Sequence, residues 1–207
     1  MCHKYNVTKH ANHWKANLDV TGIVLHACAQ HGCFAPSSGV DLHKGERQMN
    51  VDYSLSQALA HTNMEGIPSV LLIYYLMCQY KVHLQQWFRD SEYLKFPDSM
   101  KTFLGAIGQF HMHTHQESCL YRYSTSFIPG AARVDGEILE TLWSVLNQIS
   151  PSARSASMGH RAEILDDHMA DSNWKKIIFM GMFWHTFSRC TTNWEQRTLL
   201  HKNMYEL

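Results

Sequence analysis

The 207-residue chain has few charged side chains, and the two signs balance. Asp, Glu, Lys and Arg make up only 17% of the residues and the formal net charge is zero, so any nucleic-acid binding would depend on local basic patches. There is no run of about 18 apolar residues of the kind that spans a membrane. The polar start, MCHKYNVTKHANHW, is unlike a secretory signal. These absences predict a soluble, intracellular protein with no membrane partner.

Repeats, low-complexity blocks and a regular cysteine framework are also missing. The six cysteines are scattered, and an intracellular location would keep their thiols reduced. In contrast, the chain is 45% hydrophobic and contains 15 histidines. This length and composition can form one well-buried core, and spacing decides which histidines are candidate ligands.

Apolar patterning predicts strands mainly in the first half of the chain and helices in the second. We expect strands at 18–29, 69–77 and 104–111, and helices at 52–61, 78–90, 137–149, 158–187 (in two pieces) and 192–205. A loop is expected at 30–45, a linker at 151–156, and Asp52 as a helix N-cap. The fold class is therefore α/β or α+β with a helical C-terminal part.

Three soft ligands lie within six residues at Cys28, His31 and Cys33. Sulfur and imidazole are the donors that zinc favours, but a structural site needs four ligands and the fourth is not local. The alternative is a buried cysteine beside a loop histidine. The sequence leaves both interpretations open.

A second group contains His111, His113, His115 and Cys119. On a strand, the three histidines would share one face. On a helix, His111, His115 and Cys119 would share one face instead. Either arrangement could hold a metal, and the alternative is a histidine-rich surface turn.

Two acids begin the clearest amphipathic helix. Glu137 and Glu140 follow Asp135 and Gly136 at a spacing of three residues, with Trp143 one turn further on. Such acids could present carboxylates to a divalent metal. They could equally stabilise the positive end of the helix dipole.

Basic side chains that could contact phosphates are dispersed. They are Lys44, Arg47, Arg133, Arg154, Arg161, Lys175 and Lys176. They do not form one run, so the signal for a nucleic-acid surface is weak.

Several long segments, in order, resemble the KDZ (Kyakuja–Dileera–Zisupton) transposases, a family common in fungal genomes. They are HGCFAPSSGVDLHKGERQMNVDYS, the strand ending in CQY, IGQFHMHTH, FIPGAARVDGEILETLWSVLN and HRAEILDDHMADSNWKK. The resemblance runs from about Leu18 to Lys176. It implies an incomplete RNase H-like core with a mixed sheet and additional helices. It also implies a nuclear protein that acts on the DNA of transposon ends, and a possible homo-oligomer.

The family's chemistry would be DNA cleavage and strand transfer, in which three acidic residues hold two divalent metals, Mg²⁺ or Mn²⁺. The resemblance places the third acid at Glu137, with Glu140 as the second choice. Tyr75 stands at the position of the second acid, in Tyr74-Tyr75-Leu76-Met77-Cys78-Gln79, and the first acid belongs to a strand upstream of this chain. We therefore expect a partial, degenerate copy without catalytic activity.

The remaining family positions suggest ligands and contacts. The metal candidates are Cys28, His31, Cys33, His111, His115 and Cys119, with zinc as a possible ion, and the DNA-contact candidates are Lys44, Arg47, Arg133 and Arg161. We expect a poorly ordered segment at 1–17, the partial core at 18–187 and a C-terminal helix at 188–207. The alternatives are a zinc- or nucleic-acid-binding module without catalysis, and a non-functional element remnant.

Overall fold

The computed structural model describes residues 19–131 and 134–190, with side chains described as far as Met182 in the last helix. Contacts divide the chain into two compact units, residues 1–145 and 146–207. The predicted segment 1–17 and the predicted helix at 192–205 lie outside the described residues.

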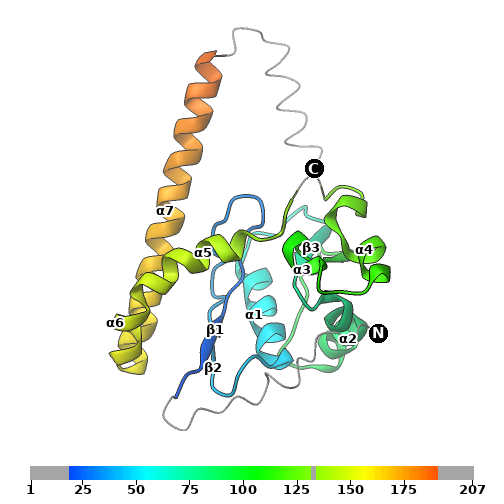
Figure 1. Ribbon diagram of the computed structural model, residues 1–207, viewed down its shortest axis with the longest axis horizontal. Helices are drawn as coiled ribbons and strands as arrows, with labels where there is room; N and C mark the ends of the chain where they lie inside the picture. Colours follow the sequence, from blue (N-terminus) through cyan, green and yellow to red (C-terminus); the bar gives the residue numbers. More distant parts are fainter. Residues whose placement is uncertain (1–18, 132–133, 191–207) are drawn as a thin grey trace. The chain divides into compact units, whose positions relative to one another are not determined.

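A parallel strand pair with a helical crossover forms the centre of the first unit (Figure 1). Strand β3 (Ser69–Ile73) pairs with β4 (Thr102–Ala106), in a register that ends at Ile73 opposite Ala106. The crossover contains α2 (Met77–Asp90). Parallel strands require such a crossover, because the chain has to return to the starting end of the sheet before the second strand can run in the same direction.

Both predicted strands are shorter than expected at their C-terminal ends. Strand β3 stops at Ile73 because the Tyr74 carbonyl accepts the Met77 N–H and the chain turns into α2. Strand β4 stops at Ala106, and a short helix, α3 (Gln109–Met112), occupies the end of the predicted strand 104–111. His111 is therefore helical, which contradicts the strand arrangement of the three histidines.

The predicted strand at 18–29 contains only a three-residue strand, and the loop expected at 30–45 contains its partner. Strand β1 (Gly22–Val24) pairs antiparallel with β2 (Val40–Leu42), and both contact α1 (Gln48–His61). The N-cap of α1 is Arg47, so the prediction that Asp52 caps it is wrong. Asp52 instead lies inside the helix and is 4% exposed.

The described residues form an α/β fold with two separate two-stranded sheets, one antiparallel and one parallel. The expectation of a single mixed sheet is therefore not met in this part of the chain. The physical reason is that β1 and β2 pack on α1 and do not extend the β3–β4 pair.

One hydrophobic cluster joins α1 and α2 to the parallel strands. Its buried members are Val51, Leu55, Leu59, Met77, Cys78, Tyr80, Leu84, Phe88, Phe103, Ile107, Met112 and Cys119. Fully burying a side chain of this size contributes about 1.5–3 kcal/mol, which makes this cluster the main stabilising feature of the first unit.

After β4, the chain forms short helices and then returns to the C-terminal end of β4. Helix α4 (Glu117–Tyr123) is followed by a 3-10 turn, η2 (Thr125–Phe127), and later by α5 (Ile138–Leu146). The Ile107 N–H donates to the Tyr123 carbonyl at 2.8 Å, which fixes the end of α4 beside the end of β4. Helix α5 begins one residue later than predicted.

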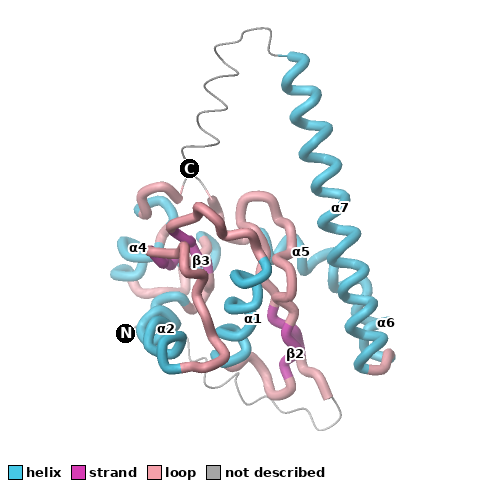
Figure 2. Tube along the Cα trace, turned by 180° about the vertical axis from the view of Figure 1, so that it is seen from behind, coloured by secondary structure: helices cyan, strands magenta, loops and turns pink. Residues whose placement is uncertain are grey.

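All the described secondary-structure elements of the second unit are helices, which confirms the helix-rich C-terminal half. It contains η3 (Asn147–Ile149), α6 (Ser150–Ser155) and α7 (Met158–Cys190), and Figure 2 shows α6 beside the start of α7. The prediction of a linker at 151–156 is wrong, because these residues mostly belong to α6. Pro151 lies in the first turn of this helix, where proline is tolerated. Helix α7 is continuous and not two pieces, and it includes residues 188–190.

Candidate functional site

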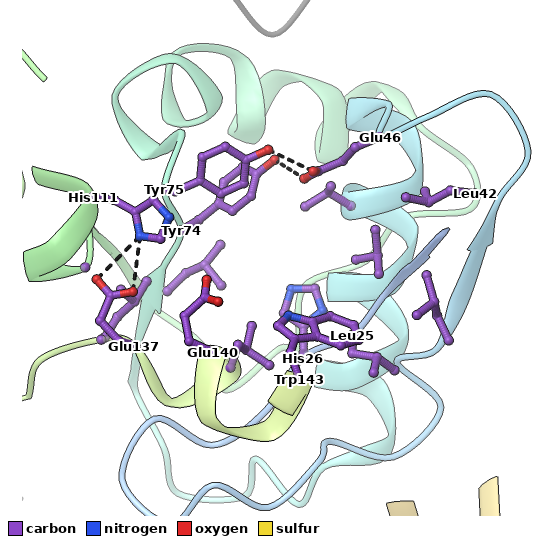
Figure 3. A pocket seen from close by; sticks show the side chains of 18 residues that line it. Leu25, His26, Leu42, Glu46, Tyr74, Tyr75, His111, Glu137, Glu140 and Trp143 are labelled. Atoms are coloured by element: carbon purple, nitrogen blue, oxygen red, sulfur yellow. Dashed lines mark hydrogen bonds and ion pairs between the residues drawn. The ribbon is translucent and has the colours of Figure 1, made fainter. Parts of the chain in front are cut away.

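A cavity of about 290 Å³ lies at the C-terminal ends of β3 and β4 (Figure 3). Its polar lining comes from segments far apart in the sequence: Glu46 before α1, Tyr74 and Tyr75 after β3, His111 in α3, and Glu137 with Glu140 at the start of α5. Apolar side chains such as Leu25 and Trp143 complete the wall. In open α/β sheets, the carboxyl ends of parallel strands are the usual place for ligands.

Glu137 is held firmly against the end of β4. Its Oε1 accepts the backbone N–H of Phe110 at 2.9 Å, and its Oε2 lies 3.1 Å from Nδ1 of His111. The Glu137 side chain is only 18% exposed. A carboxylate beside the first turn of a helix is favourable, so capping of α3 accounts for one of its two oxygens.

Two glycines allow this close approach. A Cβ on Gly108 would overlap the Glu137 carboxylate, and a Cβ on Gly136 would lie 2.8 Å from Ile73 of β3. Gly136 also has φ +77°, a conformation that favours glycine. The turn before α5 can therefore pack directly on the strand ends, and it places Glu137 there.

His111, Glu137 and Glu140 form a group of three donors. Their ligand atoms all lie within 4.8 Å of one another, with Glu140 exposed and the other two partly buried. One imidazole nitrogen and two carboxylates can bind a single divalent cation. The sequence singled out all three residues but did not show that His111 joins the acids.

Tyr74 and Tyr75 converge on one carboxylate. The Tyr74 hydroxyl donates to Glu46 Oε1 at 2.6 Å, and the Tyr75 hydroxyl donates to Glu46 Oε2 at 2.8 Å. Burial, reinforced by the charge of Glu46, raises the pKa of Tyr74 well above its ordinary value. Both oxygens of Glu46 are thus occupied by neutral donors, as Figure 3 shows.

His26 lines the same cavity as a neutral imidazole. Its Nδ1 lies 2.8 Å from the Ser54 hydroxyl, which itself donates to the Ser38 carbonyl. The single Ser54 proton is committed to that carbonyl, so Nδ1 of His26 carries the proton shared with Ser54. Burial lowers the pKa of His26 to about 4. His26 belongs to no motif, and Glu46 lies in a family segment without an assigned role, so the sequence did not identify them as cavity residues.

The other predicted metal ligands lie outside this cavity. His115 and Cys119 approach Cys78, and these three buried side chains have donor atoms within 4.8 Å of one another. The structure thus separates His111 from His115 and Cys119, and adds Cys78, which the sequence analysis did not include as a ligand. His113 is exposed.

In the other predicted cluster, Cys28 Sγ lies 3.4 Å from His31 Nδ1 in a tight turn. Within the described residues, Cys33 does not complete a compact three-donor group with them. Zinc at this turn stays a prediction.

A family model described as the Kyakuja-Dileera-Zisupton transposase matches residues 1–173. The chain belongs to the KDZ transposase family. No curated protein and no solved structure matches it. Family membership connects the chain with transposition and, in general terms, with DNA.

The resemblance to KDZ transposases implies two divalent cations held by three acids. The side chains that line the cavity can be compared with the ligands that these two cations would require. The group of His111, Glu137 and Glu140 fits one cation. A second cation would need a carboxylate at the end of β3, where this KDZ chain has the phenol of Tyr75. A neutral phenol is a poor ligand for Mg²⁺ or Mn²⁺. The residues present therefore do not fit the pair.

The candidate DNA contacts of this KDZ chain are at different places. Lys44 is exposed, and Arg47 is partly buried at the start of α1, so both flank the cavity residue Glu46 in sequence. Arg161 belongs to α7 in the second unit, and Arg133 lies outside the described residues. None of the described helices has the length and apolar character needed to cross a bilayer.

Proposed function

We propose that this chain is a transposase-derived domain that binds DNA and one divalent cation but does not cleave DNA. The observation that carries the proposal is the composition of the cavity at the ends of β3 and β4. It contains the His111–Glu137–Glu140 group on one side and, on the other, Tyr75 donating its hydroxyl to Glu46.

The location supports descent from a catalytic core. The third acid that the KDZ resemblance assigns, Glu137, lies beside the end of β4, and the second-acid position, Tyr75, lies just after β3. We infer that the parallel β3–α2–β4 unit is part of an RNase H-like sheet. In such a sheet, neighbouring parallel strands present their terminal side chains to the same edge.

The chemistry supports inactivity. In-line phosphoryl transfer with two metals requires one cation at the attacking oxygen and another at the leaving oxygen. The carboxylates that line the cavity do not replace the missing ligand, because both oxygens of Glu46 accept phenolic hydrogen bonds, and Glu137 and Glu140 already belong to the group assigned to the first cation. A single cation would bind without the second one that the reaction needs.

DNA binding would use the basic residues next to the cavity. Lys44 and Arg47 flank Glu46, so they would bring positive charge to the rim of a cavity that is otherwise acidic. With zero net charge overall, such a local patch is the form that phosphate recognition has to take here. This role would require a nuclear protein.

The test of inactivity is a nicking assay. The full chain is incubated with supercoiled plasmid in Mg²⁺ or Mn²⁺, alongside Glu137→Gln. We expect no conversion to open circles by either protein above a buffer control. Metal-dependent nicking that Glu137→Gln abolishes would overturn the proposal.

The test of DNA binding is fluorescence anisotropy with a labelled duplex over a range of salt concentrations. We expect the Lys44→Ala/Arg47→Ala double variant to bind more weakly and to show a salt slope smaller by about 2, because each phosphate contact contributes about 0.9. Lys101→Ala, an exposed lysine elsewhere in the first unit, serves as the control. If the unaltered chain shows no salt-dependent binding, the element remnant is the better interpretation.

A further inference from the structure

Three soft ligands meet inside the hydrophobic core, and none of them lines the cavity that holds the proposed cation. Cys78 comes from the first turn of α2, His115 from the segment between α3 and α4, and Cys119 from the first turn of α4. Their exposed fractions are 7%, 7% and 6%, respectively. The sequence separates Cys78 from His115 by 37 residues, so only the fold brings them together.

The imidazole of His115 is already in the form that binds a metal. Its Nε2 donates to the Tyr75 backbone carbonyl at 2.9 Å, which requires the proton to be on Nε2. Nδ1 then carries a lone pair, and it faces Cys78 Sγ at 3.4 Å. Metal-bound histidines characteristically use their other nitrogen to bind a carbonyl or carboxylate in this way.

The charges also suit a divalent metal. With its proton on Nε2 and the lone pair of Nδ1 toward Cys78 Sγ, the His115 imidazole is neutral. Two thiolates and a neutral imidazole around Zn²⁺ carry no net charge. This matters in a core where an unpaired ion would be costly.

The alternative is that two buried thiols serve only as small apolar side chains. That interpretation accounts for the burial of Cys119, since free cysteine is often buried. In the same interpretation, the Cys78 thiol would donate a hydrogen bond to His115 Nδ1, which satisfies the imidazole but gives no role to Cys119 Sγ, a second sulfur within 4.8 Å of both donor atoms. The convergence of all three donors favours a ligand.

We propose that Cys78, His115 and Cys119 bind a zinc ion, with a water molecule as the fourth ligand. Zinc accepts sulfur and nitrogen donors in tetrahedral sites, including Cys₂His sets with a fourth position for water. The ion would join α2 to the α3–α4 segment. Through His115, it would also fix the backbone of Tyr75 at the end of β3. This proposal is independent of whether the chain binds DNA or cleaves it.

Metal analysis of the full chain, purified without a metal-affinity step and under reducing conditions, tests the proposal. We expect bound zinc, and the loss of one equivalent per chain in Cys78→Ser and in Cys119→Ser. His113→Gln is the matched control, because this exposed histidine lies in the same segment as His115 but outside the group of three donors. Zinc-free wild-type protein, or zinc that persists in both core variants, would overturn the proposal.

Cobalt spectroscopy of the unaltered sequence covers the case in which a core variant fails to fold. Replacing zinc with Co²⁺ should give thiolate-to-cobalt charge-transfer absorption that is retained in His113→Gln. A His115→Cys variant should keep the metal and increase that absorption, because it adds a third thiolate. Chelation should lower the melting temperature, since a metal that binds only the folded chain stabilises it. A cobalt spectrum without thiolate bands would contradict the assignment.

Discussion

His115 holds the end of strand β3 by donating its Nε2–H to the backbone carbonyl of Tyr75 at 2.9 Å. The bond involves the main chain of Tyr75 and not its phenol. The backbone at this position is therefore fixed independently of the side chain, so a substitution at residue 75 can change the chemistry of the strand end without moving it.

The first prediction is that Tyr75→Asp creates a stronger cation site. The new carboxylate would lie near His111, whose ring centroid is 5.6 Å from that of Tyr75. We expect Mn²⁺ affinity to rise about tenfold or more in calorimetric titration, equivalent to about 1.4 kcal/mol. Tyr75→Asn is the matched control, because it has the same shape without the charge. Equal affinities for the two variants would contradict the prediction.

The second prediction concerns Tyr74, whose hydroxyl donates to Glu46 at 2.6 Å. Tyr74→Phe removes a hydrogen bond to a charged group in a poorly hydrated place. We expect the free energy of unfolding to fall by about 1.5–3 kcal/mol in urea titration. Tyr93→Phe, at a side chain that is 79% exposed, should change it by less than about 0.5 kcal/mol. Equal effects would mean that the Tyr74–Glu46 bond adds no stability.

The sequence was sufficient for the elements with a strong periodic pattern. Helix α2 was predicted at 78–90 and occupies Met77–Asp90, and the helix after Glu137 was also predicted. The three-residue strand β2 was missed because its pairing with β1 is a tertiary property. Helix α6 was missed because Pro151 can break a helix or begin one, and the pattern does not distinguish these.

The site was predicted as a set of residues but not as an arrangement. His111, Glu137 and Glu140 were all candidates, yet their grouping depends on the glycines that let the α5 turn approach β3 and β4. Cys78 was overlooked because its partners are distant in the sequence. Ligands joined by tertiary packing leave no local spacing to detect.

The third prediction is a loss of stability in acid that depends on His26. Burial lowers the pKa of His26 from 6.5 to about 4. As pH falls below 6.5, His26 binds a proton in the unfolded chain but not in the folded chain. The free energy of unfolding that neutral His26 contributes above pH 6.5 is therefore lost as pH falls toward about 4. The loss is at most about 3 kcal/mol. Urea titrations over this range should show a smaller decline for His26→Gln than for the unaltered chain; parallel declines would exclude His26 as the cause.

The fourth prediction has the opposite sign and concerns Asp52. Burial raises the pKa of Asp52 from 3.8 to about 6, while the nearby Tyr80 hydroxyl partly opposes the shift. The folded chain binds the Asp52 proton more tightly than the unfolded chain does. The free energy of unfolding that Asp52 contributes below pH 3.8 is therefore lost as pH rises through about 6. Asp52→Asn should be more stable than the unaltered chain at pH 8 and lose this advantage at pH 4. An unchanged difference across these pH values would contradict the prediction.

The fifth prediction tests whether Gly108 is needed to position Glu137. A methyl group at Gly108 would overlap the Glu137 carboxylate, so Gly108→Ala should displace it from His111 and Phe110. We expect a loss of about 1–3 kcal/mol in the free energy of unfolding, together with weaker Mn²⁺ binding. Gly181→Ala is the control, because a Cβ there would contact nothing within 4 Å, and alanine in a helix should be neutral or stabilising. If Gly108→Ala matches the unaltered chain in both measurements, Glu137 has room to bind its cation without this close approach, and the glycine has no role in the site.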